Sequence, residues 1–402
     1  MKILVILPRF PFPLEKGDKL RAYHQIRTLS NNNEVFLFAL SHKSVPEYAI
    51  AEMRKYCKEI HLVRLPRLFA ACNVIRNFFG TRSLQIGYWD SKKARNQFRQ
   101  FEAEVNPDVI YAQMVRTMIY AAHSVRPKVL DFQDALSMNL ERRMSKYRGL
   151  RYFALHYEFK MLRSAEYNAC GIFDALTIIS ESDSDAVPRH KDTEIEIVRN
   201  GVDFDYFRHD LSEKKNSVVF CGNMQYAPNI DAARFLVNDI MPRVWKVYPD
   251  ANVVIAGATP KPSVKRLENS RVTVTGSVED IRPYYAQSEV FVAPMRLGSG
   301  LQNKILEAMS MGVPCVTTPL ANDTIGAVSG EDILIGNNAD ELADHIIGLL
   351  KDEPLRSRIA ENASEFVRRH FSWEATGEQL QTILQNAIMT HENHEEVELE
   401  DE

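Results

Sequence analysis

The segment 297–317 constrains the fold of this chain more than any other, because it joins a glycine-rich loop to a helix and two strands. An apolar run at 289–294 comes before the loop, and a second strand-like run at 315–317 follows a helical stretch that ends at Gly312. The order strand, loop, helix, strand is typical of a parallel α/β sheet. The segment therefore predicts a helix that begins at the carboxyl edge of such a sheet.

The same loop carries the residue types of an anion site. The first backbone N–H groups of a helix have no partner within the helix, and its dipole places positive charge there. Lys304 adds a full positive charge, and Glu307 follows one helical turn later on much the same face. Cationic groups suit a diphosphate, and a carboxylate suits the two hydroxyls of a ribose. We therefore predict a nucleotide-diphosphate site at Gly300, Gln302, Asn303, Lys304 and Glu307; a plain turn is the alternative.

The segment 300–316 resembles the donor site of retaining glycosyltransferases with the GT-B fold, in the large group called family 4. Its strings Gly-Leu-Gln-Asn-Lys and Leu-Glu-Ala-Met-Ser-Met-Gly are similar to those of sugar transferases from exosortase and exopolysaccharide gene systems. In the broad family two glutamates lie eight positions apart, and the second matches Glu307. The first falls on Ser299, where this sequence departs from the pattern.

The resemblance implies a function and a set of ligands. The expected reaction moves a sugar from a nucleotide-diphosphate sugar to a glycan or lipid-linked acceptor, with retention, in the synthesis of an exopolysaccharide or cell-surface polysaccharide. Lys304 is expected to stabilise the leaving diphosphate, so that neither a metal nor another cofactor is required.

Strand-like and helical segments alternate along the chain, which predicts α/β domains with parallel sheets. The strand-like runs are at 2–7, 34–40, 59–64, 109–111, 128–132, 175–179, 217–222, 251–256, 272–275, 290–293 and 315–317. A long charged helix is expected at 138–170. The two series of strands fit two Rossmann-like domains, which is the architecture of the GT-B fold.

Domain boundaries follow from the composition of the segments between these series. We expect an N-terminal acceptor domain at 1–205, a polar linker at 206–216 and a nucleotide-sugar donor domain at 217–370. The resemblance implies that a helix at 371–390 crosses back to pack on the first domain. The acidic tail at 391–402 is expected to be disordered.

The loop after the first strand is expected to lie beside the ligand, because ligands bind at the carboxyl ends of parallel strands. Gly17 permits a close backbone approach, and Asp18 can cap the helix that follows. The resemblance implies that Gly17 faces the donor phosphates. Lys19 and Arg21 fit a role in the site or a role as surface charges equally well.

A second polar loop follows the strand at 128–132. Asp134 in this loop is our candidate for a catalytic carboxylate that contacts a sugar hydroxyl or the acceptor. Helix capping is the alternative for Asp134, and it is the stronger interpretation for Asp131.

The loop that opens the second domain lacks the Arg and Lys that many members of the family use to bind the diphosphate, since no basic residue lies between Gly222 and Arg234. Lys304 is expected to replace their charge. Asn223 can offer an amide to the phosphate or the sugar, although an asparagine that serves the turn is nearly as good an interpretation.

Composition excludes some classes of function. The chain has 402 residues, of which 45% are hydrophobic, and this suffices for two or three domains. A net charge of −4 argues against nucleic-acid binding. The five cysteines are scattered, which suits a cytoplasmic protein and offers no metal site. Asp203 and Asp205 match a metal-binding motif, but their context at the end of the first domain favours a turn.

The segment 61–100 has eight basic residues and one acidic residue, with apolar and aromatic residues between them. This pattern predicts a contact with an anionic membrane surface, on the inner face of the plasma membrane, with a solvated helix face as the alternative. No uninterrupted apolar stretch reaches the length of a membrane span.

Two other functions remain open from the sequence. A sugar-nucleotide epimerase of the same fold also binds a nucleotide diphosphate, but it needs more acid–base residues than Asp134 alone. A catalytically impaired partner of a glycosyltransferase complex is the other alternative, because Ser299 replaces the family's first glutamate.

Overall fold

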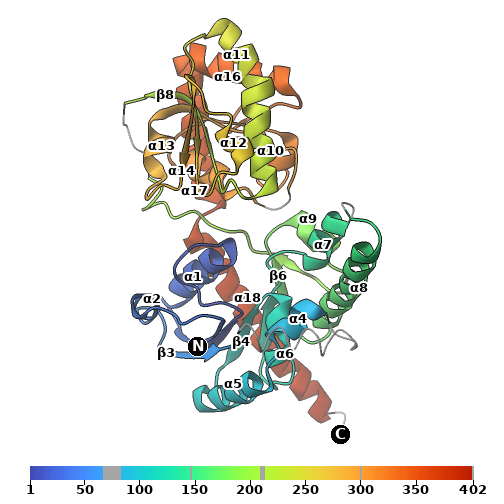
Figure 1. Cartoon of the computed structure of the whole chain (residues 1–402). Coiled ribbons are helices and arrows are strands. Elements are labelled where there is room, and N and C mark those ends of the chain that lie inside the picture. The colour runs from blue at the N-terminus through green and yellow to red at the C-terminus, as the bar shows by residue number, and fades with distance from the viewer. Residues whose placement is uncertain (67–82, 145–146, 209–212, 299–300, 401–402) are drawn as a thin grey trace. The chain divides into compact units, whose positions relative to one another are not determined.

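The computed structural model describes residues 1–66, 83–144, 147–208, 213–298 and 301–400. The chain divides into two compact units, of which the first combines Met1–Asn200 with Trp373–Glu402 and the second is Gly201–Ser372. Figure 1 shows a sheet with helices around it in each unit. The chain therefore passes between the two units twice.

The first unit is built on a seven-stranded parallel sheet. Its strands are β1 (Lys2–Leu7), β2 (Glu34–Ser41), β3 (Glu59–Arg64), β4 (Val109–Gln113), β5 (Lys128–Asp131), β6 (Ala175–Ile178) and β7 (Glu196–Ile197). In space they follow the order β3-β2-β1-β4-β5-β6-β7, so the direction in which the sheet is built reverses between β1 and β4.

Helices cover both faces of this sheet. They are α1 (Gly17–Leu29), α2 (Glu47–Met53), α4 (Leu84–Trp89), α5 (Lys92–Val105), η1 (Val115–Thr117), α6 (Met118–Ala121), α7 (Leu136–Met144), α8 (Leu150–Ala169), α9 (Glu181–Ala186) and α18 (Trp373–Glu400). Side chains of β1 alternate between two cores: Ile3 and Val5 pack with residues of α1 and α18, while Leu4 and Ile6 pack with residues of α5 and α8. The strands are apolar on both faces for this reason.

The helix α18 belongs to the first unit although it follows the second unit in the chain. Where it packs on α1, a Cβ atom at Gly377 would lie 2.1 Å from Thr28 Cγ2, so only glycine fits. At its start the ring of Trp373 stacks on that of His24, with ring centroids 4.6 Å apart. The acidic tail at 391–402, expected to be disordered, is helical as far as Glu400. Glutamate favours helix, and a helix that packing already fixes can propagate into the tail.

The second unit has a six-stranded parallel sheet in the order β10-β9-β8-β11-β12-β13. Its strands are β8 (Asn216–Cys221), β9 (Val253–Ala256), β10 (Val272–Gly276), β11 (Ser288–Ala293), β12 (Cys315–Thr317) and β13 (Leu334–Ile335). Its helices are α10 (Ala227–Phe235), η2 (Leu236–Ile240), α11 (Met241–Val247), α12 (Pro262–Lys265), α13 (Arg282–Ala286), α14 (Asn303–Ser310), α15 (Pro319–Asn322), α16 (Ala339–Lys351) and α17 (Glu353–His370). Two α/β units with parallel sheets confirm the predicted fold class.

Two segments differ from the sequence prediction. In place of one helix at 138–170 the chain forms α7 and α8, because Gly149 has a positive φ of 64° that no helix continues. The described residues of the segment expected as a linker, 206–208 and 213–216, belong to the second unit. There Ser310 Oγ donates a hydrogen bond of 2.6 Å to the carbonyl of Phe207, and Lys214 Nζ donates one of 2.7 Å to that of Ala286.

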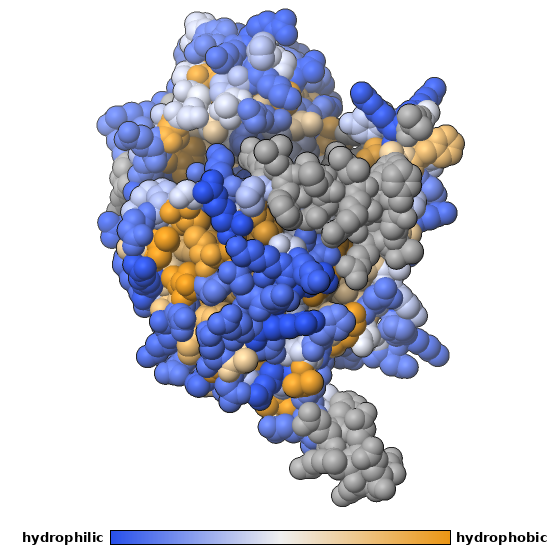
Figure 2. All heavy atoms as spheres, turned by 60° about the horizontal axis from the view of Figure 1, so that its bottom comes forward, coloured by the Kyte–Doolittle hydropathy of each residue, from blue (hydrophilic) through white to orange (hydrophobic). Residues whose placement is uncertain are grey.

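No helix in the described parts of the chain is long and apolar enough to cross a membrane. Of the basic segment at 61–100, residues 67–82 lie outside the described residues. Ile86 and Trp89, two apolar residues of this segment, are buried in the core of the first unit and do not offer a membrane contact. Figure 2 shows a largely hydrophilic face of the molecule, with hydrophobic side chains gathered in patches.

Candidate functional site

The predicted anion loop lies where the direction of the second sheet reverses. The strand order is β10-β9-β8-β11-β12-β13, so the sheet grows in one direction from β8 and in the other from β11, and these two strands are paired. Asn223 and Asn229 follow β8, whereas Gln302 and Lys304 follow β11. In open parallel sheets, ligands bind outside the carboxyl ends of the strands at such a reversal.

The side chain of Lys304 is the centre of this group. Its Nζ donates hydrogen bonds to Asn229 Oδ1 at 3.0 Å and to Gln302 Oε1 at 2.8 Å. Both acceptors are neutral amides, and within the described residues no carboxylate lies within ion-pair distance of Nζ. The ammonium group is thus held in place without being neutralised, which suits it to bind an anion.

Burial lowers the pKa of Lys304 to about 8, although the charge of Glu307 acts in the opposite direction. Ordinary lysines titrate about two units higher. A bound anion beside Nζ would favour the ammonium form and raise this pKa again. Anion binding at Lys304 is therefore coupled to the protonation of its side chain.

Two glycines allow Asn229 to reach Lys304. A Cβ atom at Gly222 would lie 2.7 Å from Asn229 Nδ2, and one at Gly257 would lie 1.9 Å from the carbonyl oxygen of Gly222. Asn229 Nδ2 donates a hydrogen bond of 3.0 Å to the carbonyl of Asn223, which leaves Oδ1 to face Lys304. The loops after β8 and β9 are therefore packed so closely that their backbones orient the amide.

Glu307 lies one helical turn after Lys304 on α14. Its Oε2 accepts a hydrogen bond of 2.8 Å from the hydroxyl of Tyr285, a fully buried residue of α13. Burial raises the pKa of Glu307, while this hydrogen bond and the charge of Lys304 lower it. Among the described residues Oε1 has no hydrogen-bond partner, so the carboxylate has an acceptor to offer to a ligand hydroxyl.

Most of the predicted donor-site residues lie at the start of α14. Gln302 is the N-cap and contacts Lys304, and Asn303 begins the helix. Asn303 Oδ1 is buried and has no hydrogen-bond partner in the described part of the chain. Ser299 and Gly300 lie outside the described residues. The structure thus brings Gln302, Asn303, Lys304 and Glu307 together on the first turns of one helix.

Asn223, predicted to donate to a phosphate or sugar, has its side chain in a turn. Its Oδ1 accepts a hydrogen bond of 2.9 Å from the backbone N–H of Gln225. Such a bond is typical of asparagine in tight turns. Its main contribution to the site is the carbonyl that holds Asn229.

In the first unit, Gly17 is the first residue of α1, and no atom lies within 4 Å of a Cβ atom built there. Packing within the described chain therefore does not require glycine at this position. Asp18 does not cap the helix as predicted: Lys16 is the N-cap, and the carboxylate of Asp18 forms an ion pair with Arg9. Asp18 thus lies within the helix and its carboxylate is engaged by Arg9.

Asp134 follows β5 at the carboxyl edge of the first sheet, after Gln133, whose φ is +63°. Burial and the charge of Asp183 raise the pKa of Asp134 to about 6, although Arg21 acts in the opposite direction. A carboxylate that titrates so close to neutrality is common at functional sites. The neighbouring Asp131 is buried and bound by Arg21, so it is a structural residue and does not cap a helix.

The possible metal motif has a local role in the structure. Asp203 Oδ1 accepts a hydrogen bond of 3.0 Å from the backbone N–H of Tyr206, as expected for a turn. In the described ranges, no group of three or more His, Cys, Asp or Glu side chains is arranged to hold a metal ion.

Sequence reasoning missed Asn229 and Tyr285. Asn229 lies 75 positions from Lys304 in the sequence, and Tyr285 lies 22 positions from Glu307. Each pair comes into contact only when the second sheet has folded. The position of Asn229 soon after a strand was a usable signal, because residues there reach the ligand edge of the sheet. Tyr285 carries no such signal, since a buried aromatic residue on a helix usually serves the core.

A family model described as "Glycosyl transferases group 1" matches residues 215–352, which lie in the second unit. The chain is 24% identical over 395 residues to an uncharacterized 44.6 kDa protein in the cps region of Klebsiella pneumoniae, covering 92% of this chain and 96% of that protein. It is also 24% identical over 262 residues to the capsular polysaccharide biosynthesis glycosyltransferase CapM of Staphylococcus aureus, covering 60% of this chain and 67% of that protein.

The fold is that of GT-B glycosyltransferase structures. The crystal structure of HepE from Anabaena in complex with UDP-glucose is similar, with a TM-score of 0.66 at 16% sequence identity. The similarity covers 96% of this chain and 99% of that one. Together with the family match, the fold supports a glycosyltransferase with GT-B architecture.

Proposed function

We propose that this chain is a glycosyltransferase that moves a sugar from a nucleotide-diphosphate sugar to a glycan or lipid-linked acceptor in the synthesis of a cell-surface polysaccharide. The observation that carries the proposal is the half-buried Lys304, which neutral amides hold in place at the start of α14, one turn before Glu307. The relative named for capsular polysaccharide synthesis and the solved complex with UDP-glucose support the class of product and of donor.

In the proposed mechanism, the diphosphate binds at Lys304 and at the N–H groups of the first turn of α14, and the ribose binds Glu307. Negative charge grows on the diphosphate as the bond to the sugar breaks. Donors that already point to that position lower the barrier, because they need not reorganise during the reaction. Lys304 and the helix dipole supply the counter-charge, so we propose transfer without a metal ion and with retention at the anomeric carbon.

The proposal is tested by screening nucleotides and nucleotide sugars for thermal stabilisation of the protein, and then measuring nucleotide release with the best donor. We expect one nucleoside diphosphate and its sugar to raise Tm, and release to require an acceptor and to persist in a chelator. An epimerised sugar nucleotide formed without an acceptor would show instead that the protein is an epimerase. Loss of release in the chelator would refute metal independence.

Glu307→Gln is expected to weaken nucleotide binding by about 10-fold, because an ionised acceptor of ribose hydroxyls becomes a neutral one. Isothermal titration with the nucleotide found in the screen gives the Kd. The exposed Glu268→Gln is the matched control and should leave the Kd unchanged. An unaltered Kd in Glu307→Gln would remove the carboxylate from the ribose site.

A further inference from the structure

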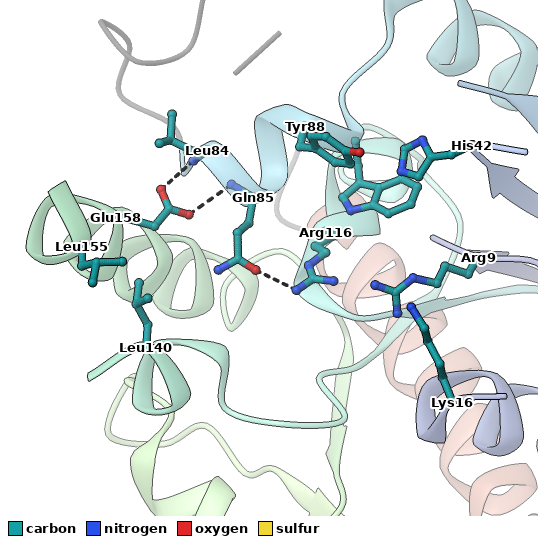
Figure 3. Close-up of a pocket in the computed structure, with 11 residues that line it drawn as sticks. Arg9, Lys16, His42, Leu84, Gln85, Tyr88, Arg116, Leu140, Leu155 and Glu158 are labelled. Atoms are coloured by element: carbon teal, nitrogen blue, oxygen red, sulfur yellow. Dashed lines mark hydrogen bonds between the residues drawn. The ribbon is translucent and has the colours of Figure 1, made fainter. Parts of the chain in front are cut away.

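A cavity of about 630 Å³ lies at the carboxyl edge of the first sheet. Arg9 follows β1, His42 follows β2 and Arg116 follows β4, and all three line it (Figure 3). The order of the strands reverses between β1 and β4, so the cavity lies at the place in this sheet where ligands of open parallel sheets bind. Its volume is in the range of small-molecule sites.

One end of the cavity is cationic. Arg9 and Lys16 line it there, with Arg116 next to them toward the middle of the cavity, and Arg9 forms an ion pair with Asp18. Arg116 Nη2 donates a hydrogen bond of 2.7 Å to the neutral Gln85 Oε1. Its Nε is buried and has no hydrogen-bond partner in the part of the chain that the structure describes. Burial and the charge of Arg9 lower the pKa of Arg116 to about 10, as expected for a cation that lacks a close anion.

The acidic residue among the lining side chains does not neutralise this end. The carboxylate of Glu158 accepts hydrogen bonds from Ser83 Oγ at 2.6 Å and from the backbone N–H groups of Leu84 and Gln85 at 2.7 and 3.1 Å. The Glu158 carboxylate therefore accepts its hydrogen bonds from the start of α4. Among the described residues no carboxylate forms an ion pair with Arg116, so an anionic group of a ligand can take that place.

The other end of the cavity is aliphatic. Leu84 of α4, Leu140 of α7 and Leu155 of α8 line it. Figure 3 shows these leucines on the side opposite Arg9 and Lys16, with Arg116 between the two groups. A cavity with cations at one end and leucines at the other matches a ligand that has an anionic group and an apolar chain.

We propose that this cavity binds the acceptor, and that the acceptor is a phosphate ester with an apolar chain, whose phosphate contacts Arg116 and whose chain lies along the three leucines. This inference rests on the proposed function, because only a transferase has an acceptor. Asp134, the candidate catalytic carboxylate, follows β5 at the carboxyl edge of the same sheet.

Binding of farnesyl phosphate, inorganic phosphate and farnesol to the full chain tests the proposal by isothermal titration. We expect farnesyl phosphate to bind at least 10-fold more tightly than either of the others. Arg116→Gln should weaken farnesyl phosphate by about 10-fold or more, and Leu155→Asn should weaken it without affecting inorganic phosphate. The exposed Arg54→Gln is the matched control for Arg116→Gln and should bind as the unaltered protein does.

Three further results would overturn the proposal. Equal affinity for inorganic phosphate and farnesyl phosphate would show that a phosphate without a chain is the ligand. Loss of farnesyl phosphate binding in Lys304→Met, with normal binding in Arg116→Gln, would place the ligand in the second unit. Nucleotide binding is measured in parallel, because a protein that binds its nucleotide but not farnesyl phosphate would keep the proposed function and lose only this inference. Should Arg116→Gln fail to fold, Leu155→Asn decides.

Discussion

Lys304→Met is expected to lower kcat by about 10²- to 10³-fold, which is the effect of removing one donor that stabilises charge in a transition state. Methionine keeps much of the length and apolar volume of the side chain, so α14 should remain, as should the packing beside Phe220, whose ring centroid lies 5.8 Å from Lys304 Nζ. The ammonium group and its two hydrogen bonds to Asn229 and Gln302 are lost. Nucleotide release under saturating donor and acceptor measures the effect, with the exposed Lys265→Met as the control.

The pH dependence separates charge from shape in this prediction. Because the pKa of Lys304 is lowered to about 8, the free protein has the ammonium form below that pH and loses it as the pH rises through 8. Only the ammonium form binds the diphosphate well, so kcat/KM for the donor should fall about 10-fold per pH unit on the alkaline side. Lys304→Met should lack this limb. A near-normal rate in Lys304→Met would remove this residue from the mechanism.

Arg21→Met is expected to destabilise the first unit by about 3–5 kcal/mol, since removing one partner of a buried ion pair leaves the other charge buried alone. Arg21 is 1% exposed and Asp131 is fully buried, and Arg21 Nε lies 2.6 Å from Asp131 Oδ2. Arg21 Nη1 also donates a hydrogen bond of 2.9 Å to Asn200 Oδ1. Arg21 therefore connects α1 to the sheet through Asp131, and to Asn200 at the end of the first segment of this unit.

Scanning calorimetry of the full chain measures this effect. For a unit of this size the Tm should fall by roughly 10 °C, and the transition of the second unit should stay in place. Combining Arg21→Met with Asp131→Leu should restore part of the loss, because no unpaired charge remains. The surface variant Arg54→Met should change little, as its exposed ion pair with Glu47 is worth little. A Tm close to that of the unaltered protein would show that the pair is not needed for stability.

The sequence was enough to predict the fold class, because buried parallel strands read as short apolar runs between helices. It failed at β7 and β13, which have only two residues each, and at the break between α7 and α8. One glycine at position 149 decides that break, and an isolated glycine within a helical pattern is often tolerated. Boundaries of this kind depend on single dihedral angles, which composition does not reveal.

In the donor site, too, local motifs could be predicted from the sequence, whereas contacts between distant segments could not. The loop before α14 is a local motif, so its residues could be named from the sequence. The contacts of Lys304 with Asn229 and of Glu307 with Tyr285 join segments that only the folded sheet brings together. Arg21 was open to either role from the sequence, and its burial beside Asp131 makes it a structural residue. The cationic cavity likewise depends on side chains from several separate elements.

The return of α18 to the first unit has a consequence for how the protein is made. The helix supplies Leu380, Ile383 and Leu384 to the core against β4 and β5, yet it leaves the ribosome only after the whole second unit. During synthesis the part of the first sheet that α18 covers therefore stays exposed, although α1 already packs on the same face. The second unit has all its strands in one segment and can fold as a continuous piece. A fragment ending at Ser372 would keep that part of the first sheet exposed, and isolating the first unit requires joining 1–200 to 373–400.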